Sequence, residues 1–496
     1  MTRAVILAID QGTTGTTVLL VDEAGQVRDR AYREITQHYP RPGWVEHDAE
    51  EIWRTVTEAT AEVLGSGRGV PTSIGITNQR ETFVLWDRRS LQPVHRAIVW
   101  QCRRSSDICR QLKEEGHEAV FRERTGLLLD PYFSGTKLRW LLDHEDDIRA
   151  RAEAGELAFG TIDSWLIARL TGGRVHATEP GNASRTLLFD IRAMGWDGEL
   201  CEILRVPRAL LPEVRDSSGD FGRTDPASFL NLDLPIAGVA GDQQAALFGQ
   251  ACFTPGMCKN TYGTGSFVLL NTGEEPRLSS TGMLATVAWQ LEGRPTYAME
   301  GAIFATGAAL QWLRDGLQVI QQASDAGPIA AATTDTGGVH LVPAFAGLGA
   351  PHWDPAARGL ICGLTGGSTR DQVVRAAVES MAFQTADVLQ AMASEGVRPS
   401  ELRVDGGASV MDALLQFQAD LLGVPVVRSS TAETTALGAS FLAGLATGAW
   451  SSLDEVAATW TAAARFTPAM AGAERERRLE GWHAAVRRAL TTLDHS

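Results

Sequence analysis

The feature that most constrains the fold is a glycine-rich turn between two apolar runs near the N-terminus. Residues 5–9 and 18–21 are apolar, and the stretch IDQGTTGTT joins them. This pattern predicts a strand, a tight turn and a returning strand. Because Gly12 and Gly15 permit positive φ and a close approach of the backbone, the N–H groups of the turn can point together at an anion. The turn is a candidate phosphate-binding site. An ordinary hairpin with a polar turn is equally consistent with this sequence.

Polar side chains in and beside this turn extend the phosphate hypothesis. Thr13 and Thr14 add hydroxyl donors, and Asp10 stands at the end of the first strand. Asp10 is a candidate holder of Mg²⁺ through water, because this ion keeps much of its hydration shell in proteins.

The turn has a second copy in the middle of the chain. The stretch YGTGS, residues 262–266, lies between runs at residues 257–261 and 267–270. Two copies predict two related lobes, with phosphates held in a cleft between them whose opening and closing is the working motion. Two unrelated hairpins are the alternative.

Length and charge bound the class of protein. A chain of 496 residues is long enough for two large lobes, which we expect over residues 1–250 and 251–496. The net charge of −15 argues against nucleic acid or an anionic membrane as a partner, because their phosphates would repel the protein. The apolar run at residues 4–9 is too short for a signal peptide or a membrane span, so we expect no stable membrane insertion and a cytoplasmic location.

Motifs of several common enzyme classes are missing. The chain has six cysteines but no CxxC pair, which favours reduced structural thiols over disulfides or a zinc site. The sequence also lacks HExxH, a Walker A motif, GxSxG and a complete GxGxxG. The absence of these motifs argues against the common metalloproteases, P-loop NTPases, α/β-hydrolases and Rossmann-fold enzymes.

Charged and aromatic residues follow several expected strands. Arg80 and Glu81 come shortly after a buried run at residues 73–77. Such residues lie at the carboxyl edge of a sheet, where open α/β folds bind ligands; an exposed ion pair worth little is the alternative. Trp100 ends another apolar run and Tyr132 lies in the loop DPYFSGTK. Either can face a pocket, but packed aromatics are the alternative.

Asp242 is the strongest candidate for a catalytic residue. The stretch GDQQAALFGQ follows an apolar run at residues 235–240 and predicts a corner from strand to helix. A carboxylate at a helix N-terminus is stabilised as the anion by free N–H groups and the helix dipole, so it is ready to accept a proton at neutral pH. A structural N-cap is the alternative, and the two roles can coexist.

The second half of the chain offers two further places for a nucleotide. We expect a helix over residues 301–317, with Gly307 and Gln311 one turn apart on one face. The stretch DGGAS, residues 405–409, leads from a short strand to a helix, and the backbone around Gly407 can approach a nucleotide there.

An ordered set of motifs makes the chain recognisable. DQGTT, ITNQRET, AIVWQCRR, DPYFSGTK, AGDQQAALFGQ, NTYGTG, GLGAPHWDPAARG and RVDGGA occur in this order. Together they resemble the glycerol kinases, a family of carbohydrate kinases with the actin, Hsp70 and hexokinase type of ATPase core, over nearly the whole chain. The resemblance implies an α/β fold of two duplicated ribonuclease H-like lobes with a catalytic cleft between them. It also implies ATP-dependent phosphorylation of glycerol to sn-glycerol 3-phosphate, the first step of glycerol catabolism, with Mg²⁺ as cofactor, and assembly as a homodimer or homotetramer.

This resemblance assigns roles to individual residues. The residues at glycerol-binding positions are Arg80, Glu81, Tyr132, Asp242 and Gln243. The residues at the apolar walls against the carbons of glycerol are Trp100 and Phe267. The residues at contacts to ATP or ADP and their phosphates are Thr13, Thr14, Gly15, Thr264, Gly307, Gln311, Gly407 and Met411. Asp10 matches the residue near Mg²⁺, and Asp242 matches the base that takes the proton of the attacking hydroxyl.

The sequence departs from the family at several of these positions. Thr17 stands where many members carry Arg, and Gly15 where Ser is usual, so we expect two phosphate contacts to be weaker or replaced. Met411 belongs to a run that lacks the usual Asn after DGGA, which affects a hydrogen bond to adenine. Residues 227–235 are short and acidic where some members have a basic loop implicated in inhibition by sugar bisphosphates. We therefore expect no inhibition by fructose 1,6-bisphosphate.

Three other functions compete with glycerol phosphorylation. The first is a kinase of the same family that acts on another polyol or a ketose. The second is a nucleotide-driven switch or chaperone-like ATPase, which would turn over ATP regardless of small alcohols. The third is a kinase with impaired use of ATP, for which Thr17 and Met411 are the motivation.

Overall fold

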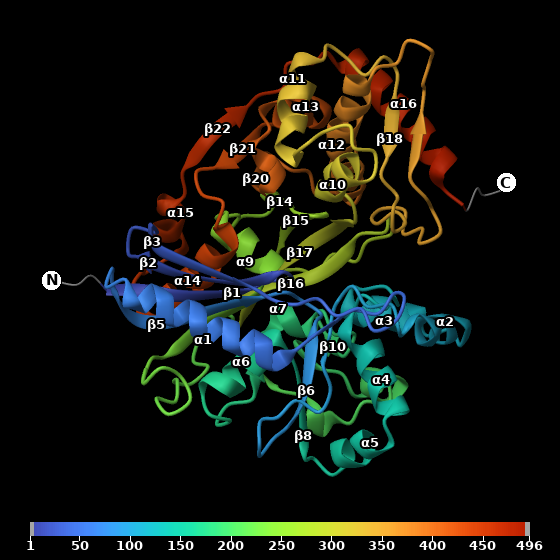
Figure 1. Cartoon of the computed structure of the whole chain (residues 1–496). Coiled ribbons are helices and arrows are strands. Elements are labelled where there is room, and N and C mark those ends of the chain that lie inside the picture. Colours follow the sequence, from blue (N-terminus) through green and yellow to red (C-terminus); the bar gives the residue numbers. More distant parts are fainter. Residues whose placement is uncertain (1–3, 492–496) are drawn as a thin grey trace.

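Two mixed β-sheets of the same construction form the core of the protein. The computed structural model describes residues 4–491, and Figure 1 shows in blue the strands of the first sheet that precede residue 80. The first sheet has five strands in the order β13-β5-β1-β2-β3. Their bounds are Ala4–Gln11 for β1, Gly15–Asp22 for β2, Val27–Glu34 for β3, Val70–Asn78 for β5 and Ile236–Gly241 for β13.

The first hairpin forms as the sequence predicted. β1, β2 and β3 are antiparallel neighbours, β5 runs parallel to β1, and β13 runs parallel to β5. The N–H of Gly12 donates to the carbonyl of Gly15 over 2.9 Å and closes the turn between β1 and β2.

The second sheet repeats this arrangement with one extra strand at each edge. Its seven strands run in the order β16-β17-β15-β14-β20-β21-β22. Their bounds are Cys258–Tyr262 for β14, Ser266–Gly273 for β15, Leu284–Leu291 for β16, Arg294–Ile303 for β17, Leu402–Gly406 for β20, Val426–Ser429 for β21 and Ala462–Phe466 for β22. The five strands β14, β15, β17, β20 and β21 pair in the same directions as β1, β2, β3, β5 and β13. The fold is α/β with two duplicated lobes, which confirms the prediction.

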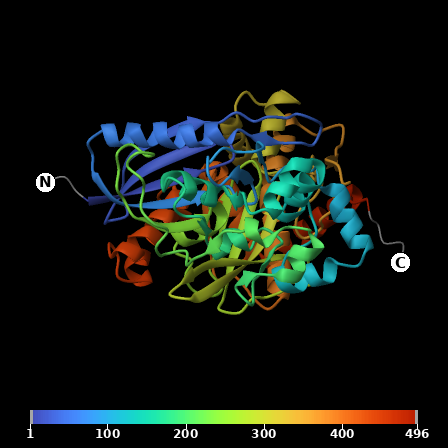
Figure 2. The same ribbon diagram turned by 90° about the horizontal axis from the view of Figure 1, so that it is seen from below.

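Helices pack on each sheet. α1 (Ala49–Gly65) packs on β2 and β3 and runs along one border of the molecule in Figure 2. It begins where the side chain of Asp48 accepts hydrogen bonds from two backbone N–H groups of the first turn. α12 (Arg370–Ser394) packs on β15 and β17, and α13 (Asp412–Leu422) packs on β21.

The two lobes share helices where they meet. α9 (Asp242–Gly249) follows β13 and reaches β14 and β15, whereas α14 (Thr434–Thr447) follows β21 and packs on β1, β5 and β13 of the first sheet (Figure 1). The backbones of α9 and α14 touch at Gly249 and Gly438, where a Cβ would overlap a carbonyl of the other helix. The apolar core at this junction includes Leu19, Phe248, Leu269 and Phe441.

A third region is inserted mainly between β5 and β13. It contains a four-stranded sheet in the order β4-β7-β6-β8. These strands are Glu46–His47 for β4, Phe83–Asp87 for β6, Ala97–Ile98 for β7 and Leu157–Thr161 for β8. The helices of this region are Ser106–Glu114 for α2, Glu118–Thr125 for α3, Ser134–His144 for α4, Asp146–Glu153 for α5, Ile162–Leu170 for α6, Pro180–Ala183 for α7 and Gly198–Ile203 for α8.

Shorter elements complete the chain. The short strands are Ala177–Thr178 for β9, Phe189–Asp190 for β10, Gly195–Trp196 for β11, Glu213–Val214 for β12, His340–Val342 for β18 and Leu360–Cys362 for β19. The remaining helices are Gly307–Asp315 for α10, Ala326–Ala332 for α11, Leu453–Thr459 for α15 and Gly472–Ala489 for α16. Within residues 4–491, no helix is long and apolar enough to cross a membrane.

The expected helix over residues 301–317 is wrong at its beginning. β17 continues to Ile303, because residues 301–303 pair with the start of β15. The helix, α10, begins only at Gly307. A short apolar run with small residues is consistent with a buried strand as well as with a helix. The sequence alone therefore does not locate the start of this helix.

Candidate active site

Arg80 and Glu81 lie just beyond β5, at the carboxyl edge of the first sheet. Their exposed fractions are 2% and 1%, so they do not form an exposed ion pair. Glu81 adopts a φ of 59°, in the left-handed region that non-glycine residues rarely occupy. Its carboxylate accepts a hydrogen bond from Nε of Arg185 over 2.6 Å, whereas Nε of Arg80 lies 3.9 Å away.

The guanidinium of Arg80 is held by a carboxylate from the second sheet. Nη1 donates to Oε2 of Glu300 over 2.5 Å, and Nη2 donates to Oε1 over 3.1 Å. The same nitrogens donate to Oε1 of Gln244 and to the hydroxyl of Tyr132, each over 3.3 Å. Among the hydrogen bonds of residues 4–491, none uses Nε of Arg80, which lies 3.3 Å from Oδ1 of Asp242. This Nε–H can therefore donate to a bound hydroxyl.

Glu300 lies on β17 and is completely buried. Burial disfavours its charge, but the guanidiniums of Arg185 and Arg80 outweigh that effect and lower the pKa of Glu300 to about 2. Nη2 of Arg185 donates to Oε1 of Glu300 over 2.8 Å. For Glu81 the effect of burial prevails over the two arginines, and its pKa is raised. Two arginines and two glutamates thus form a buried network that includes residues of both lobes.

Three aromatic rings lie beside this network. The ring centre of Trp100 lies 5.6 Å from that of Tyr132 and 6.3 Å from that of Phe267, in edge-on contacts. The guanidinium of Arg80 lies 5.7 Å from the ring centre of Phe267, within cation–π range. Burial raises the pKa of Tyr132 well above its ordinary value, so its hydroxyl stays protonated. Rings from segments far apart in sequence therefore lie together beside the guanidinium of Arg80.

Asp242 begins α9 beside Arg80. Its carboxylate accepts a hydrogen bond from the N–H of Gln243 over 2.7 Å, and its side chain keeps 27% exposure. Burial raises the pKa of Asp242, while the charges of Arg80 and Lys259 oppose this shift without cancelling it. The carboxylate therefore binds a proton more readily than an exposed aspartate does.

Lys259 reaches Gln243 from β14 of the second sheet. Its ammonium donates to Oε1 of Gln243, to the hydroxyl of Thr261 over 3.0 Å and to the carbonyl of Phe267 over 3.3 Å. Because the amide oxygen of Gln243 accepts this bond, its amide nitrogen is left to donate elsewhere. Burial lowers the pKa of Lys259 to about 8.

Trp100, part of the aromatic wall formed with Phe267, is hydrogen-bonded to the first turn. Nε1 of Trp100 donates to the hydroxyl of Thr13 over 2.9 Å, and Nε2 of Gln37 donates to the carbonyl of Thr13 over 2.6 Å. The carbonyl of Thr14 accepts from the N–H of Ile35 over 3.0 Å. These bonds fix the turn next to Trp100.

The packing of the hairpin explains one departure from the family pattern. A Cβ at Gly15 would overlap the carbonyl of Arg33 and the ring of Tyr32 on β3. Glycine is therefore the residue that this hairpin accommodates. Thr17, the other departure in this hairpin, lies opposite Asp10 in the register of β1 and β2.

Asp10 occupies a negatively charged environment. Burial raises its pKa to about 8, and the carboxylates of Asp242 and Glu433 contribute to the shift. A divalent cation near this carboxylate would offset the repulsion. Asp10 therefore fits the binding of Mg²⁺ by one carboxylate together with water and phosphate oxygens.

The second turn is joined to the start of α10. The carbonyl of Thr264 accepts from the N–H groups of Thr306 and Ala308, each over 3.0 Å, and the carbonyl of Gly263 accepts from the N–H of Gly307 over 3.1 Å. A Cβ on Gly307 would lie 2.6 Å from the carbonyl oxygen of Gly263. The structure therefore brings Thr264 and Gly307 together.

The other three nucleotide candidates occupy separate elements of the second lobe. Gln311 is an exposed residue of α10. Gly407 follows β20 and opens a short 3-10 turn, Gly407–Val410. Met411 is buried in the core of this lobe, where its side chain packs against Gly327 of α11.

Family comparisons agree with this architecture. The model of the N-terminal domain of the FGGY family of carbohydrate kinases matches residues 5–249, and the model of its C-terminal domain matches residues 258–447. The chain belongs to the FGGY family of carbohydrate kinases.

Several FGGY relatives are similar over almost their full length. The chain is 56% identical over 489 residues to the glycerol kinase of Dechloromonas aromatica (strain RCB), covering 98% of this chain and 97% of that protein. It is 55% identical over 490 residues to the glycerol kinase of Stenotrophomonas maltophilia (strain R551-3), covering 98% of both. The crystal structure of Plasmodium falciparum glycerol kinase with ADP matches with a TM-score of 0.93 at 36% identity, covering 99% of both chains.

Three residues of this FGGY kinase site were missed by the sequence analysis: Arg185, Lys259 and Glu300. Glu300 interrupts the apolar run YAMEGAI, and Lys259 lies in the strand CKNTY. A charge within a buried strand requires a partner, so both residues carried a signal that could have been used. Arg185 lies in the polar loop TEPGNASRT, where another charge is unremarkable.

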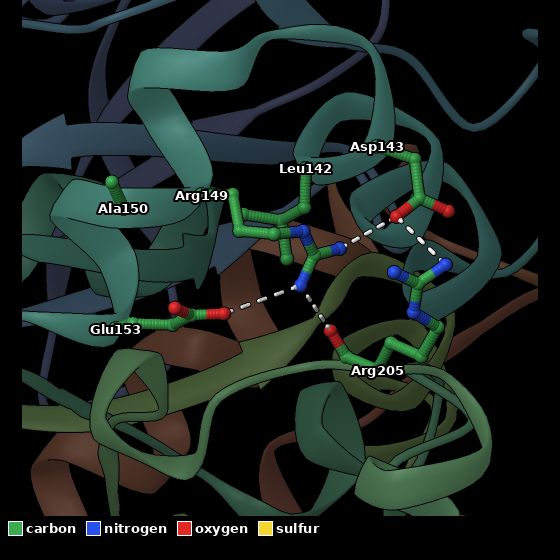
Figure 3. A pocket seen from close by; sticks show the side chains of 6 residues that line it. All are labelled: Leu142, Asp143, Arg149, Ala150, Glu153 and Arg205. Atoms are coloured by element: carbon green, nitrogen blue, oxygen red, sulfur yellow. Dashed lines mark hydrogen bonds and ion pairs between the residues drawn. The ribbon is translucent and has the colours of Figure 1, made fainter.

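A surface hollow of this FGGY kinase lies in the inserted region, apart from the residues above (Figure 3). Its lining residues are Leu142, Asp143, Arg149, Ala150, Glu153 and Arg205. Arg149 donates to Oδ1 of Asp143 over 2.6 Å and to the carbonyl of Arg205 over 3.2 Å. The charged side chains that line this hollow thus pair with one another. None of the site residues predicted from the sequence lines the hollow.

Proposed function

We propose that this chain transfers the γ-phosphoryl group of ATP to a terminal hydroxyl of glycerol and yields sn-glycerol 3-phosphate, the first step of glycerol catabolism. The observation that best supports this function is the buried network around Arg80. The residues beside this network are Tyr132, Trp100, Phe267 and Asp242. The high identity to glycerol kinases supports the same substrate.

The residue types at this site suit a small triol. Glycerol has few carbons to bury, so recognition depends on hydrogen bonds to its hydroxyls. Nε of Arg80, the carboxylates of Glu81 and Asp242 and the amide of Gln243 supply donors and acceptors, and Tyr132 adds a hydroxyl. The rings of Trp100 and Phe267 would lie against the carbon chain.

Asp242 would act as the general base. The proton of the terminal hydroxyl passes to its carboxylate as the hydroxyl oxygen attacks the γ-phosphorus. The bond from that phosphorus to the oxygen that bridges to the β-phosphate breaks, and ADP leaves. A raised pKa brings the carboxylate closer to the working pH, where base catalysis is typically worth about 10²- to 10⁴-fold.

The two turns and the second lobe would hold the nucleotide. We assign the phosphates to Thr13, Thr14 and Gly15 in the first turn. The residues that we assign to other ATP or ADP contacts are Thr264, Gly307, Gln311, Gly407 and Met411. Asp10 would hold Mg²⁺, which when bound would offset the charge on the phosphates.

Domain boundaries, assembly and location complete the proposal. We assign residues 1–250 to the lobe that binds glycerol and phosphate, and residues 251–496 to the lobe that binds adenosine and phosphate. We infer a homodimer or homotetramer from the family resemblance. We also place the enzyme in the cytoplasm, where ATP is available.

The test is a coupled ADP-release assay with the purified chain. ATP and other nucleoside triphosphates are compared with no alcohol, glycerol, a tetritol and a pentulose. We expect ADP release that depends on glycerol and is fastest with it. Faster turnover with the tetritol or pentulose would instead indicate another polyol or ketose kinase, and turnover that ignores alcohols would indicate a nucleotide-driven switch.

A further inference from the structure

The network around Arg80 contains two residues, Arg185 and Glu300, that the proposed reaction does not use. Glu300 lies on β17 of the second lobe, yet both of its carboxylate oxygens accept hydrogen bonds from Arg80. Such a two-pronged pairing fixes the plane of a guanidinium as well as its position. With the bonds to Gln244 and Tyr132, the only nitrogen of the guanidinium that donates no hydrogen bond within residues 4–491 is the Nε beside Asp242.

Other contacts rule out a free rotation of this carboxylate. Oε1 of Glu300 also accepts from Nη2 of Arg185 over 2.8 Å, and Nε of Arg185 donates to Glu81 over 2.6 Å. Arg185 is itself completely buried, 5.6 Å from the ring centre of Tyr132. Glu300 therefore joins two residues that we assign to the alcohol, Arg80 directly and Glu81 through Arg185.

We propose that Glu300 is a positioning residue for the alcohol, and that the glycerol site is complete only when β17 of the second lobe supplies this carboxylate. The inference rests on the proposed glycerol phosphorylation. It refines the lobe roles proposed above, because a residue of the lobe that we assign to adenosine sets the geometry of alcohol recognition.

The placement of Glu300 gives it a second consequence for the reaction. β17 pairs with β15, and Glu300 lies opposite Leu269, two residues beyond Phe267. Arg80 therefore meets the carboxylate of β17 and the ring of β15 on the same sheet. A displacement of this sheet relative to the first lobe would disturb both contacts at once, so glycerol binding and the arrangement of the lobes are coupled.

The test compares Glu300→Gln with a matched control, Glu379→Gln. Glu379 is also a buried glutamate of the second lobe paired with an arginine, since its Oε1 accepts from Nε of Arg375 over 2.7 Å. Each variant is assayed for the KM of glycerol, the KM of ATP and kcat, and for glycerol binding without nucleotide by calorimetry. Thermal melting establishes that each variant is folded.

We expect Glu300→Gln to raise the glycerol KM and Kd by at least about 30-fold while the KM for ATP changes less than about threefold, because it removes the charge of one partner of a buried pair and turns an acceptor of arginine hydrogen bonds into a donor. Glu379→Gln should change none of the three kinetic constants by more than about twofold. Glu300→Asp keeps the charge but is one methylene shorter, so it should recover part of the lost affinity.

The outcomes separate this inference from the proposed function. Glycerol-dependent ADP release by the unaltered chain tests the function alone. A glycerol KM within threefold of the unaltered value in Glu300→Gln overturns the positioning role, as do equal increases in the KM of glycerol and of ATP. If Glu300→Gln does not fold, Glu300→Asp decides by the same criterion.

Discussion

The turns that close the two hairpins share a sequence pattern but contact different partners. In the first lobe the hydroxyl of Thr13 accepts from Trp100, so the turn is joined to the aromatic wall. In the second lobe the carbonyl of Thr264 accepts from Thr306 and Ala308, so the turn is joined to the start of α10. In the proposed function, the first turn would therefore connect the phosphates to the alcohol site, and the second turn would connect them to a helix that contacts the nucleotide.

The strand-to-helix connections after β13 in the first sheet and after β21 in the second also make different contacts. After β13 the chain places Asp242 beside Arg80, where its side chain is partly accessible. After β21 it places Thr434, whose hydroxyl donates to Asp405 over 2.6 Å within the protein. The proposed general base therefore belongs to one copy, and the first residue of the corresponding helix in the other copy makes an internal contact.

The largest effect on catalysis should come from replacing Asp242, the residue that distinguishes the connection after β13 from the one after β21. Asp242→Asn keeps the size of the side chain but cannot take the proton of glycerol, so we expect kcat to fall by about 10³-fold while glycerol binding stays largely intact. A single-turnover assay and calorimetry measure the two quantities. Retained phosphoryl transfer in this variant would remove Asp242 from its role.

A smaller effect should appear when the second turn is disturbed. Gly307→Ala places a Cβ 2.6 Å from the carbonyl of Gly263, which pushes α10 away from the turn. We expect the KM for ATP to rise about 10-fold, a cost of about 1.4 kcal/mol, with the glycerol KM unchanged. Gly366→Ala is the control, because a Cβ there meets no atom within 4 Å. Equal changes in both KM values would show that the two turns are not specialised.

The link between the first turn and the aromatic wall can be tested by Trp100→Phe. This change keeps a ring but removes the donor to Thr13, and one neutral hydrogen bond is worth about 1 kcal/mol. We expect the glycerol KM to rise by about fivefold. Adding Thr13→Val should then raise the glycerol KM little further, because the shared bond is already lost, whereas the missing phosphate contact should appear in the KM for ATP. Fully additive effects in this double-mutant cycle would contradict the link.

A still smaller effect concerns the lysine that connects the lobes. Burial lowers the pKa of Lys259 to about 8, so the ammonium is charged below that pH and loses its charge above it. Since the charge favours the anion of Asp242 and holds Gln243, we expect kcat/KM for glycerol to fall about two- to fivefold as the pH rises from 7 to 9. Lys259→Arg keeps its charge and should move this decline upward by at least about one pH unit. An unchanged profile would exclude Lys259 as the cause.

The last expectation is the absence of an effect. Residues 227–235 lack the basic loop of some family members, and Asp233 in this segment accepts from Arg223 over 2.7 Å. Fructose 1,6-bisphosphate should therefore leave the rate unchanged in the coupled assay. Strong inhibition would show that a sugar bisphosphate binds elsewhere on the chain.

Local signals in the sequence were enough to predict the repeated unit. The turns at residues 9–17 and 262–266 form as expected, because the glycines and flanking apolar runs favour hairpins irrespective of the rest of the chain. The corner at Asp242 was also predicted, since an apolar strand followed by a carboxylate at a helix start is a local pattern. The start of α10 was not, because residues 301–303 are held in β17 by pairing with β15.

The buried charges show why the rest of the site could not be predicted. The motifs indicated Arg80 and Glu81 as ligand-binding residues, with an exposed ion pair between the two as the alternative. Their actual partners, Glu300 and Arg185, are separated from them by more than 100 residues of sequence. Spacing along the chain gives no information on such contacts without the fold.

The crossing of α9 and α14 limits how the molecule can move and how it can be divided. Because there is no room for a side chain between the two backbones at Gly249 and Gly438, any sliding that brought a larger residue to either position would make the helices clash. Each helix also packs on strands of the opposite half, and Phe441 of α14 belongs to the same apolar cluster as Leu19 of β2. Neither half should be stable when produced alone, and a split chain should regain solubility only when its fragments are co-expressed.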